Sequence, residues 1–397
     1  MKKFLLFGAA AMLACAANAQ TITEMWAHDL SVEGNNIRNC AVLGDQVVVA
    51  NMGTGLVEFY DATGKTAKSY NVNDFTATQQ IGVTGDDGKF TAYNLGRGIE
   101  VDEKGNIVVN LNFPNAPSAY NFVAIAADGT MTYIPCAVPS TAGEAARADY
   151  FGVSGNVLDQ GYIALAMNKV APIVVYNIYQ GLQDPDYSYI IKPEGENVTY
   201  SNETDVVFAT KTLVLDEEGN AVNAGAFYVY NPSIGNVHYT DGTSALTTIT
   251  GSVTGGVIGV NKGTCRGAGA FSSNGVDYLV LPAQRATTDE RDKGFEVRNA
   301  VTGEVVVYCA GAKDFGSAIY QDFSAEVNAD GTVNIAQVVQ GRYLAMFKLT
   351  LDASAIEEIA ADNAAVEYYN LQGVKVANPE NGIFVKKQGG KATKVVL

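Results

Sequence analysis

The stretch "GRGIEVDEKGNIVVN", residues 96–110, carries the clearest structural signal in the chain. In it, Ile99 and Val101 alternate with polar residues, "DEKGN" supplies turn formers, and Ile107 starts an apolar run. Alternation with a period of two, followed by an Asp-, Gly- and Asn-rich turn, is typical of two antiparallel strands joined by a tight connection. The stretch therefore predicts a β-hairpin whose turn residues serve the backbone.

The composition extends this prediction to the whole chain. Of the 397 residues, 47% are hydrophobic and only 17% are charged, which is enough to bury a large core and argues against general disorder. Short runs rich in Val, Ile, Tyr and Thr recur between 41 glycines, and apolar runs with a helical period are nearly absent. We expect an all-β protein.

The hairpin pattern repeats along the sequence. Apolar strands that follow a turn start at residues 47, 107, 162, 278 and 333, and the gap near residue 220 holds the similar turn "DEEGNAV". A second series of apolar strands ends in Asp or Asn at residues 61, 128, 177, 231, 299 and 352. Both series have a period of about 58 residues and both count six units.

Small sheets of this kind cannot bury both faces alone, and stacking them radially solves the problem. The sequence therefore predicts a β-propeller of about six blades over residues 20–353, with Val48, Val108 and Ile163 on equivalent inner strands. The segment 22–32 precedes the first unit and could close the ring by adding a strand to the last blade.

Residues 96–110 also resemble an NHL-type propeller repeat, in which a Gly-Ile-x-Val-Asp-x-x-Gly-Asn turn precedes an Ile/Val strand. "LVEFYDATGK", residues 56–65, is similar to the outer strand and terminal turn of that repeat. The resemblance covers about one and a half blades. It implies a propeller fold and turn-forming roles for Gly98, Asp102, Gly105 and Asn106, and it says little about function.

The N-terminal residues have the pattern of a bacterial Sec signal peptide. A basic pair at residues 2–3, an apolar run at 4–14 and the small residues Ala17 and Ala19 precede Gln20. We expect residues 1–19 to be removed, with the Sec translocon and signal peptidase as partners. The protein is then exported, to the extracellular space or the outer-membrane surface, or otherwise to the periplasm.

The cysteines leave several possibilities open. Cys15 lies in the leader and would be the lipidated residue of a lipoprotein, although residues 12–14 match a lipobox poorly. The other four lack metal-type spacing, and export would permit disulfides between them. Three pairings, or free buried thiols, remain possible for Cys40, Cys136, Cys265 and Cys309.

The charge balance narrows the choice of partners. The net charge is −16, and removal of the leader with its two lysines makes it −18. An acidic surface repels nucleic acid and anionic lipid head groups, so we expect no nucleic-acid partner.

The C-terminal residues form a different segment. Residues 354–365 are rich in Ala and acidic residues and are expected to be a linker, and residues 366–397 contain four short strands separated by turns. This segment resembles the C-terminal sorting domain of Bacteroidetes type IX secretion cargo. The resemblance implies the type IX machinery as a partner and a small β-sandwich-like domain. The alternative is a plain β-appendage. The matching positions are Tyr369, Asn370, Leu371, Gly373, Gly382 and Val385.

Catalytic motifs are missing from the sequence. It has only two histidines, His28 and His238, and it lacks a G-x-S-x-G elbow and a calcium-loop pattern. We therefore expect no catalytic residue, no metal ligand and no cofactor, with calcium bound by carboxylates at the channel as the alternative.

One segment is richer than a blade requires. Residues 179–205 combine acidic residues with four tyrosines, Tyr179, Tyr187, Tyr189 and Tyr200. Aromatic faces beside acceptors are used to bind sugars and peptides. We expect these tyrosines to form the lip of a pocket, the alternative being strand tyrosines beside a solvated loop.

Three functions follow from the sequence. The first is a non-catalytic propeller that binds a glycan, peptide or protein at the cell surface. The alternative is a propeller hydrolase or lyase with a channel metal, and a third possibility is a purely structural surface protein.

Overall fold

The structure is a computed structural model of the chain, and it divides into two compact units. One comprises residues 22–348, and the other comprises residues 349–397 together with 1–21. The expected signal peptide and linker lie outside the described residues. Nowhere in the described residues is a helix long and apolar enough to cross a membrane. The described residues are 20–34, 36–74, 82–84, 90–92, 94–112, 119–137, 149–166, 173–191, 200, 204–232, 236–242, 247–248, 267–286, 291–311, 320–351, 366–370, 374–377, 383–388 and 391–396.

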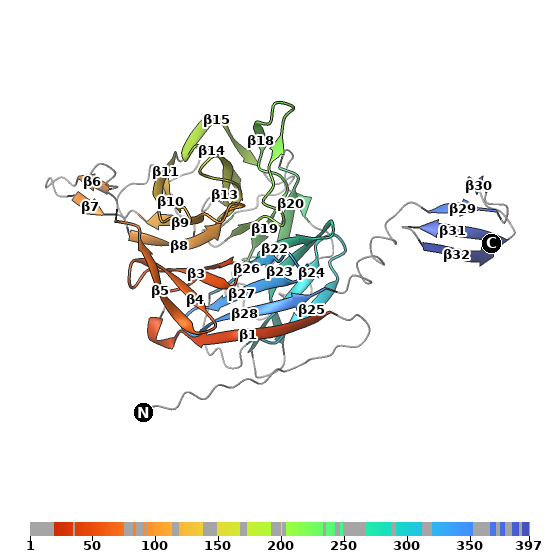
Figure 1. Cartoon of the computed structure of the whole chain (residues 1–397), viewed down its shortest axis with the longest axis horizontal. Helices are drawn as coiled ribbons and strands as arrows, with labels where there is room; N and C mark the ends of the chain where they lie inside the picture. Colours follow the sequence, from red (N-terminus) through yellow and green to blue (C-terminus); the bar gives the residue numbers. More distant parts are fainter. Residues whose placement is uncertain are drawn as a thin grey trace. The chain divides into compact units, whose positions relative to one another are not determined.

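The prediction of an all-β protein is confirmed for this part of the chain. The described residues of the larger unit form six four-stranded sheets and two short hairpins, and a 3₁₀ turn at Ser31–Glu33. In Figure 1 the strands β22 and β26 lie in the middle of this unit, while β5, β11, β15 and β25 lie toward its rim.

The strands of the six sheets follow one another in chain order, except in the sixth. The sheets are β2 (Cys40–Leu43), β3 (Gln46–Asn51), β4 (Leu56–Asp61) and β5 (Gly64–Asn71); β8 (Asn94–Val101), β9 (Ile107–Asn112), β10 (Ala119–Ile125) and β11 (Met131–Ala137); β12 (Gly152–Gly155), β13 (Gln160–Ala166), β14 (Ile173–Tyr179) and β15 (Leu182–Ile191); β16 (Asp205–Val207), β19 (Phe227–Asn231), β20 (Asn236–Thr240) and β21 (Thr247–Thr248); β22 (Gly269–Ser273), β23 (Val276–Ala286), β24 (Arg291–Asn299) and β25 (Val305–Cys309); and β26 (Gln321–Val327), β27 (Val333–Val339), β28 (Tyr343–Thr350) and β1 (Thr21–Asp29). The hairpins are β6 (Gly82–Thr84) with β7 (Phe90–Ala92), and β17 (Val214–Leu215) with β18 (Ala221–Asn223).

The cores lie between neighbouring sheets. Val48 of the first sheet packs in one cluster with Val109 of the second, and Val108 of the second packs in another with Ile163 of the third. Val48, Val108 and Ile163 lie on β3, β9 and β13, the second strand of each sheet, so they are on equivalent strands as predicted. Strands that are buried on both faces read as continuous apolar runs, which is why these segments stood out in the sequence. The innermost strand of each sheet is the first one.

The first strands of the six sheets form a closed cycle. β2 contacts β8 and β26, β12 contacts β8 and β16, and β22 contacts β26. The remaining link joins β16 to the residue before β22, because the Ala268 backbone N–H donates to Asp205 Oδ2 over 2.8 Å. We call the region between these first strands the channel.

The cycle is closed by a ladder of three side chains. On β26, alternate residues accept hydrogen bonds from alternate backbone N–H groups of β2 and the turn after it, over 2.9–3.0 Å. The pairs advance together along both strands, so β2 and β26 run in the same direction. β1 adds the outer strand to this same sheet, as predicted for the segment that precedes the first unit. The ladder pairs are Cys40 with Asp322, Val42 with Ser324, and Gly44 with Glu326.

The turn in residues 102–106 has the expected local chemistry. Asp102 Oδ1 accepts the backbone N–H of Asn106, Asp102 Oδ2 accepts its side-chain N–H, and Gly105 has a φ of +81°. Gly98 is not a turn residue, contrary to what the NHL resemblance implied. It lies inside β8, where an added Cβ would be 2.7 Å from the Phe151 ring, so it is required for close approach.

The fourth sheet differs from the predicted assignment by one strand. The apolar strands that end in Asp or Asn are the third strands of the other five sheets. Residues 227–231 belong to that series, but they form β19, the second strand of its sheet. The turn at residues 216–220, expected near a second strand, instead joins the separate hairpin of β17 and β18. The fourth first strand is therefore followed by an insertion, residues 208–226.

The smaller unit contains one described sheet. Its strands are β29 (Glu367–Tyr369), β30 (Lys375–Val376), β31 (Ile383–Gln388) and β32 (Lys391–Val396), in the order β30-β29-β31-β32. The four strands form a single layer, so the expected sandwich-like packing of two layers is not seen in the described residues. The strands predicted from the sequence after residue 365 thus form one sheet in the structure.

The structure shows the state of two of the four cysteines that were left open. Cys40 and Cys136 are free, buried thiols, and burial raises the pKa of both, which makes them unreactive. Cys309 is half-buried at the end of β25, and Cys265 lies outside the described residues.

Candidate functional site

The candidate site is a cavity in the channel. It contains about 310 Å³ of space free of protein atoms, including its open mouth. Its walls come from the first strands of five sheets or from residues next to them, so it lies at the centre of the ring. The lining residues are Glu100, Gly152, Val153, Val206, Val207, Phe208, Lys211, Ala268, Gly269, Ala270, Phe323, Ser324 and Ala325.

Small residues bring the walls together and leave the space between them. A Cβ on Gly152 would lie 2.4 Å from the Val206 carbonyl oxygen and 2.9 Å from the Phe208 ring. A Cβ on Gly269 would be 3.3 Å from Phe323. Glycine in a strand interior often marks such a close backbone approach. Glycine on the first strands therefore lets the neighbouring walls of the cavity approach each other closely.

One ion pair supplies the accessible charge of the cavity. Lys211, from the insertion after β16, places its Nζ 3.7 Å from Glu100 Oε2 on β8 and donates a hydrogen bond to the Val101 carbonyl oxygen. The Glu100 and Lys211 side chains remain 19% and 29% exposed. Burial raises the pKa of Glu100 to about 7, against the opposing effect of Lys211. A carboxyl group with this pKa in a cavity is typical of a functional site.

Two buried carboxyl groups lie beside the cavity. Asp205 and Asp322 are 3% and 4% exposed, and each accepts a backbone N–H at the start of a neighbouring sheet. Burial raises the pKa of both well above the usual range, and the negative charge of Glu100 raises both further. The charge of Asp205 also raises the pKa of Asp322. Both carboxyl groups are therefore protonated more easily than exposed carboxyl groups.

The other end of the channel, where the first strands begin, is crossed by polar contacts. The Tyr150 hydroxyl donates to the Gln321 carbonyl oxygen over 3.2 Å, from the third sheet to the opposite sixth. Asn39 donates to the Asp149 carbonyl oxygen over 3.1 Å, and Arg97 Nη1 lies 2.6 Å from Asp149 Oδ2. These contacts link sheets on different sides of the channel at this end.

Three buried polar atoms at this end of the channel have no protein partner. They are Asn39 Oδ1, Arg97 Nε and Gln321 Nε2. Buried polar atoms are usually satisfied by protein or by ordered water, so this end of the channel is suited to hold bound water.

The three predicted tyrosines whose side chains are described lie in different surroundings. Tyr200 is 1% exposed, and its hydroxyl lies 3.1 Å from His238 Nδ1. Tyr189 is half-buried against the same core cluster, while Tyr179, at the end of β14, is 51% exposed. The Tyr187 side chain lies outside the described residues. Residues 182–191 of the supposed insert form the regular outer strand β15, and ligand binding at these tyrosines stays a prediction.

The histidines have local structural partners. His28 Nε2 lies 2.6 Å from the Asp61 carbonyl oxygen, and its ring stacks on Trp26 with centroids 4.9 Å apart. His238 is buried beside Tyr200. Among the described residues, there is no group of three or more His, Cys, Asp or Glu side chains that could hold a metal ion.

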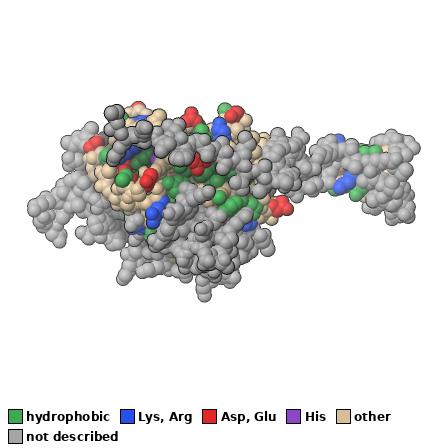
Figure 2. Space-filling view, turned by 90° about the horizontal axis from the view of Figure 1, so that it is seen from below, with side chains coloured by type: hydrophobic (Ala, Val, Ile, Leu, Met, Phe, Trp, Pro, Cys, Tyr) green, Lys and Arg blue, Asp and Glu red, His purple; other side chains and the backbone are tan. Residues whose placement is uncertain are grey.

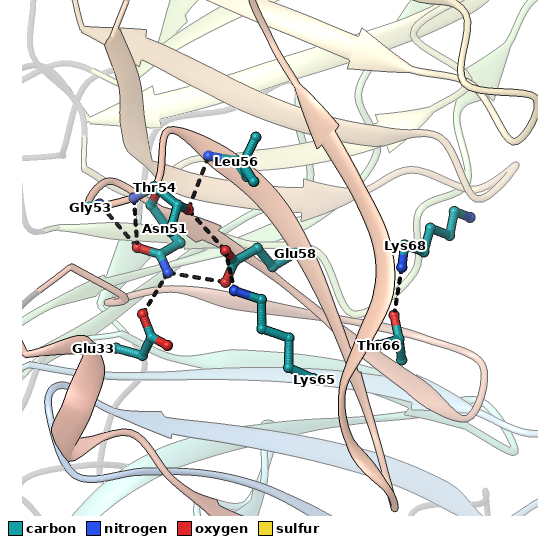
Figure 3. A network of polar contacts seen from close by, with 9 residues as sticks. All are labelled: Glu33, Asn51, Gly53, Thr54, Leu56, Glu58, Lys65, Thr66 and Lys68. Carbon is teal, nitrogen blue, oxygen red and sulfur yellow. Dashed lines mark hydrogen bonds and ion pairs between the residues drawn. The ribbon is translucent and has the colours of Figure 1, made fainter.

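A second polar network lies in the first sheet, away from the channel (Figure 3). Glu58 is fully buried, and its carboxylate oxygens accept hydrogen bonds from Thr54 and Asn51. Glu58 also forms an ion pair with Lys65, whose Nζ lies 2.6 Å from Glu58 Oε1. Asn51 also donates to Glu33 and accepts the Gly53 backbone N–H. This network fixes the turn between β3 and β4, which is a structural role.

The acidic charge is not concentrated on the face shown in Figure 2. Red acidic side chains are scattered singly over the described surface, with blue basic side chains among them. The net charge thus gives no large acidic patch on the described part of this face.

The sorting-like positions are partly described. Tyr369 ends β29, and its hydroxyl donates to Glu367. The Asn370 side chain accepts the Val374 backbone N–H over 2.9 Å. Val385 on β31 pairs with Tyr369 on β29. Leu371, Gly373 and Gly382 lie outside the described residues.

Comparison with known proteins identifies no family. No family model matches the chain, and no curated protein matches it. A similar solved structure is a structural-genomics protein of unknown function from Bacteroides thetaiotaomicron VPI-5482, with a TM-score of 0.48 and 11% identity over 85% of this chain and 77% of that one.

Two further structures are similar at a lower level. A DUF4623 family protein from Bacteroides eggerthii DSM 20697 has a TM-score of 0.46 and 11% identity over 81% of this chain and 73% of that one. A streptogramin B lyase has a TM-score of 0.41 and 12% identity over 94% of this chain and 97% of that one. Similarity at these levels says nothing about a shared activity.

Sequence reasoning missed the residues of the cavity. Glu100 lies inside the stretch of residues 96–110, where it was read only as a polar position of an alternating strand. The available signal was the pair Gly98 and Glu100, a close-approach glycine and a charge on one first strand. Lys211 had no signal, because its place depends on the insertion after β16.

Proposed function

We propose that this protein is an exported six-bladed β-propeller that binds a small ligand, or one residue of a larger ligand, in its channel cavity without chemical conversion. Six four-stranded sheets whose first strands contact one another in a cycle support the blade number. The leader pattern supports export, and the sorting-like tail supports delivery to the cell surface by a type IX system.

The cavity with its ion pair carries this proposal. Ligand pockets are concave and are equipped with a few polar groups that fix the ligand. The cavity has small and aromatic walls and one accessible ion pair, Glu100 with Lys211. Its enclosed volume is about 20 Å³, which is room for about one water-sized group, so it suits a terminal group of a monosaccharide, an amino acid or a peptide side chain rather than the whole ligand.

The alternative is a hydrolase or lyase with a channel metal. Glu100 with its pKa of about 7 could act as a base, yet the described residues supply no metal-ligand group around it. We therefore retain binding as the proposed function.

The test is a ligand screen with a variant that fills the cavity. Ala325 is half-buried and lines the cavity, so Ala325→Leu should occupy it. Ala67→Leu, on the exposed surface of β5, is the matched control. Monosaccharides, amino acids and short peptides are screened by ligand-observed NMR against the chain without residues 1–19.

A ligand that binds the parent and the Ala67→Leu variant should bind the Ala325→Leu variant at least tenfold more weakly. Equal binding to all three proteins would place the ligand elsewhere and refute the cavity. The absence of any binding across the panel would also count against the proposal.

A further inference from the structure

The hairpin of β17 and β18 exposes an unusual amount of apolar surface for its size, and it projects from the larger unit (Figure 1). Val214 and Leu215 on β17 and Val222 on β18 are 42%, 53% and 48% exposed, although β17 has only two residues and β18 only three. Single exposed apolar side chains are normal, but grouped ones mark sites of contact with other molecules. We call these three side chains the hairpin surface.

The hairpin is held in place by the third sheet. The Ala221 backbone N–H donates to Gln160 Oε1 over 2.8 Å, and the Tyr162 hydroxyl donates to the Ala221 carbonyl oxygen over 3.3 Å. Leu213, just before β17, packs with Ala221 against the core cluster of the third and fourth sheets. A surface that is fixed before binding loses less conformational freedom when a partner docks, so the exposed side chains are pre-organised for contact.

One edge of the hairpin is open to a further strand. β17 pairs with β18 and with no other described strand, whereas Ala221 on β18 is already bonded to Gln160 and Tyr162. Neither strand contains proline or a charged residue, which are common means of protecting an edge. An extended peptide that adds a strand to such an edge gains backbone hydrogen bonds and places its side chains beside those of the hairpin.

The charge around the hairpin surface is negative. Its turn contains Asp216, Glu217 and Glu218, of which the last two are exposed, and hydrogen bonds within the turn lower the pKa of Asp216. Lys211 is the only basic residue of the insertion, and it is paired with Glu100 in the cavity. Charge complementarity therefore favours a basic partner, and it disfavours nucleic acid, an anionic lipid surface or a second copy of this acidic chain.

We propose that the hairpin surface docks an extended polypeptide segment in which apolar side chains alternate with lysine or arginine. The segment adds a strand along β17, its apolar side chains cover the hairpin surface, and its basic side chains pair with Glu217 and Glu218. The partner is a protein, so this contact is separate from the ligand of the channel cavity and does not depend on it.

The experiment measures binding of short labelled peptides to the chain without residues 1–19 by fluorescence anisotropy. The first peptide alternates valine with lysine and has the proposed chemistry. A peptide that alternates valine with glutamate reverses the charge, and one that alternates serine with lysine keeps the charge but removes the apolar side chains. Because these comparisons use the parent protein, they test the inference even if a variant fails to fold.

A first pair of variants tests the apolar contact. Val214→Ser with Leu215→Ser removes most of the hairpin surface. Val301→Ser with Val305→Ser is the matched control, because these valines are 73% and 44% exposed at the turn between β24 and β25 of the fifth sheet. Circular dichroism establishes that each variant is folded.

A second pair of variants tests the charge. Glu217→Gln with Glu218→Gln removes two carboxylates from the turn. Glu24→Gln with Asp45→Asn is the matched control, because it removes two exposed carboxylates from the sixth and first sheets and gives the same net charge.

The valine–lysine peptide should bind the parent and both controls equally, and it should bind the two hairpin variants at least fivefold more weakly. The other two peptides should bind the parent at least fivefold more weakly than the valine–lysine peptide. Hydrogen exchange of the β17 amides in the parent should slow when the valine–lysine peptide is added.

Three results would overturn the inference. The first is that the valine–lysine peptide fails to bind the parent, or binds it without slowing exchange in β17. The second is equal binding of the valine–lysine and serine–lysine peptides, or equal binding to the parent and to Val214→Ser with Leu215→Ser, which would leave only non-specific charge attraction. The third is self-association of the parent in analytical ultracentrifugation that the same variant lacks, which would assign the hairpin surface to a second copy of the chain.

Discussion

Glu100 should make the folded protein less stable as the pH rises from 5 to 8. Its pKa rises from an ordinary 4.5 to about 7, mainly because of burial. Below about pH 4.5 the carboxyl group is protonated in both states. Between about pH 4.5 and 7 the folded state holds a proton that the unfolded chain has lost, so stability falls as pH rises, and above about pH 7 the loss is constant.

The magnitude follows from the two pKa values. Each pKa unit corresponds to about 1.4 kcal/mol, so the ionised Glu100 costs up to about 3 kcal/mol of unfolding free energy at pH 8. Gln has nearly the shape of the protonated carboxyl group. Glu100→Gln should therefore match the parent at pH 5 and exceed its stability by about 2–3 kcal/mol at pH 8, although it removes an ion pair.

The assay is urea unfolding at both pH values. It is followed by far-UV circular dichroism and by fluorescence of Trp26, the single tryptophan, which is buried in β1. Glu103→Gln is the control, because Glu103 carries the same charge three residues away and its side chain is 44% exposed. A Glu100→Gln protein that is less stable than the parent at pH 8, or that behaves like Glu103→Gln at both pH values, would refute the reasoning.

Two further predictions concern the channel walls and the tail. Gly152→Ala should cost about 1–3 kcal/mol, because the Cβ would meet the Val206 carbonyl oxygen at 2.4 Å, and it should weaken binding in the cavity. Gly219→Ala, with a φ of +87° and no atom within 4 Å, should cost about 1–2 kcal/mol and leave the cavity intact; thermal melts and ligand titrations compare the two, and equal effects on binding would contradict the close-approach argument. Deleting residues 366–397 should leave residues 20–353 folded but retained in the periplasm, as judged by cell fractionation, and surface delivery of the truncated protein would exclude the sorting role.

The features that the sequence predicted best are those set by local physics. The turn at residues 102–106 forms because Asp102 can accept two N–H groups of Asn106 while Gly105 adopts a positive φ, and these preferences are written in five consecutive residues. The apolar second strands were equally clear, because burial on both faces leaves no polar alternation to confuse them. The strand before the first sheet was predicted because a ring of sheets must close.

The same local physics explains the misassignment in the fourth sheet. The turn at residues 216–220 has the same hydrogen bonds as the one at 102–106, with Asp216 accepting the backbone and side-chain N–H groups of Asn220. Turn chemistry depends on its own few residues and not on the sheet that it serves. The turn of the hairpin inserted after β16 therefore has the sequence pattern of a turn that precedes a second strand. For that reason residues 227–231 were assigned to the third strand of their sheet instead of the second.

The site could not be predicted in the same way, because the ring assembles it from residues far apart in the chain. Glu100 meets Lys211 more than a hundred residues later, and Asp322 lies farther still. Tyr200 shows the same dependence on distant residues. Its polar sequence neighbours suggested a loop, but the residues that cover it belong to other strands, and its side chain is buried.

The first strand of each sheet nevertheless carries a readable signal. Such a strand must approach its two neighbours closely, which favours glycine, and it borders the channel, where an isolated charge can remain partly solvated. Gly98 with Glu100 on β8 satisfies both conditions, whereas Gly152 on β12 and Gly269 on β22 satisfy only the first. In a repeat of this kind, the strand that precedes the most apolar strand is therefore the place to search for ligand contacts, because it is the least apolar strand of a sheet that still reaches the centre of the ring.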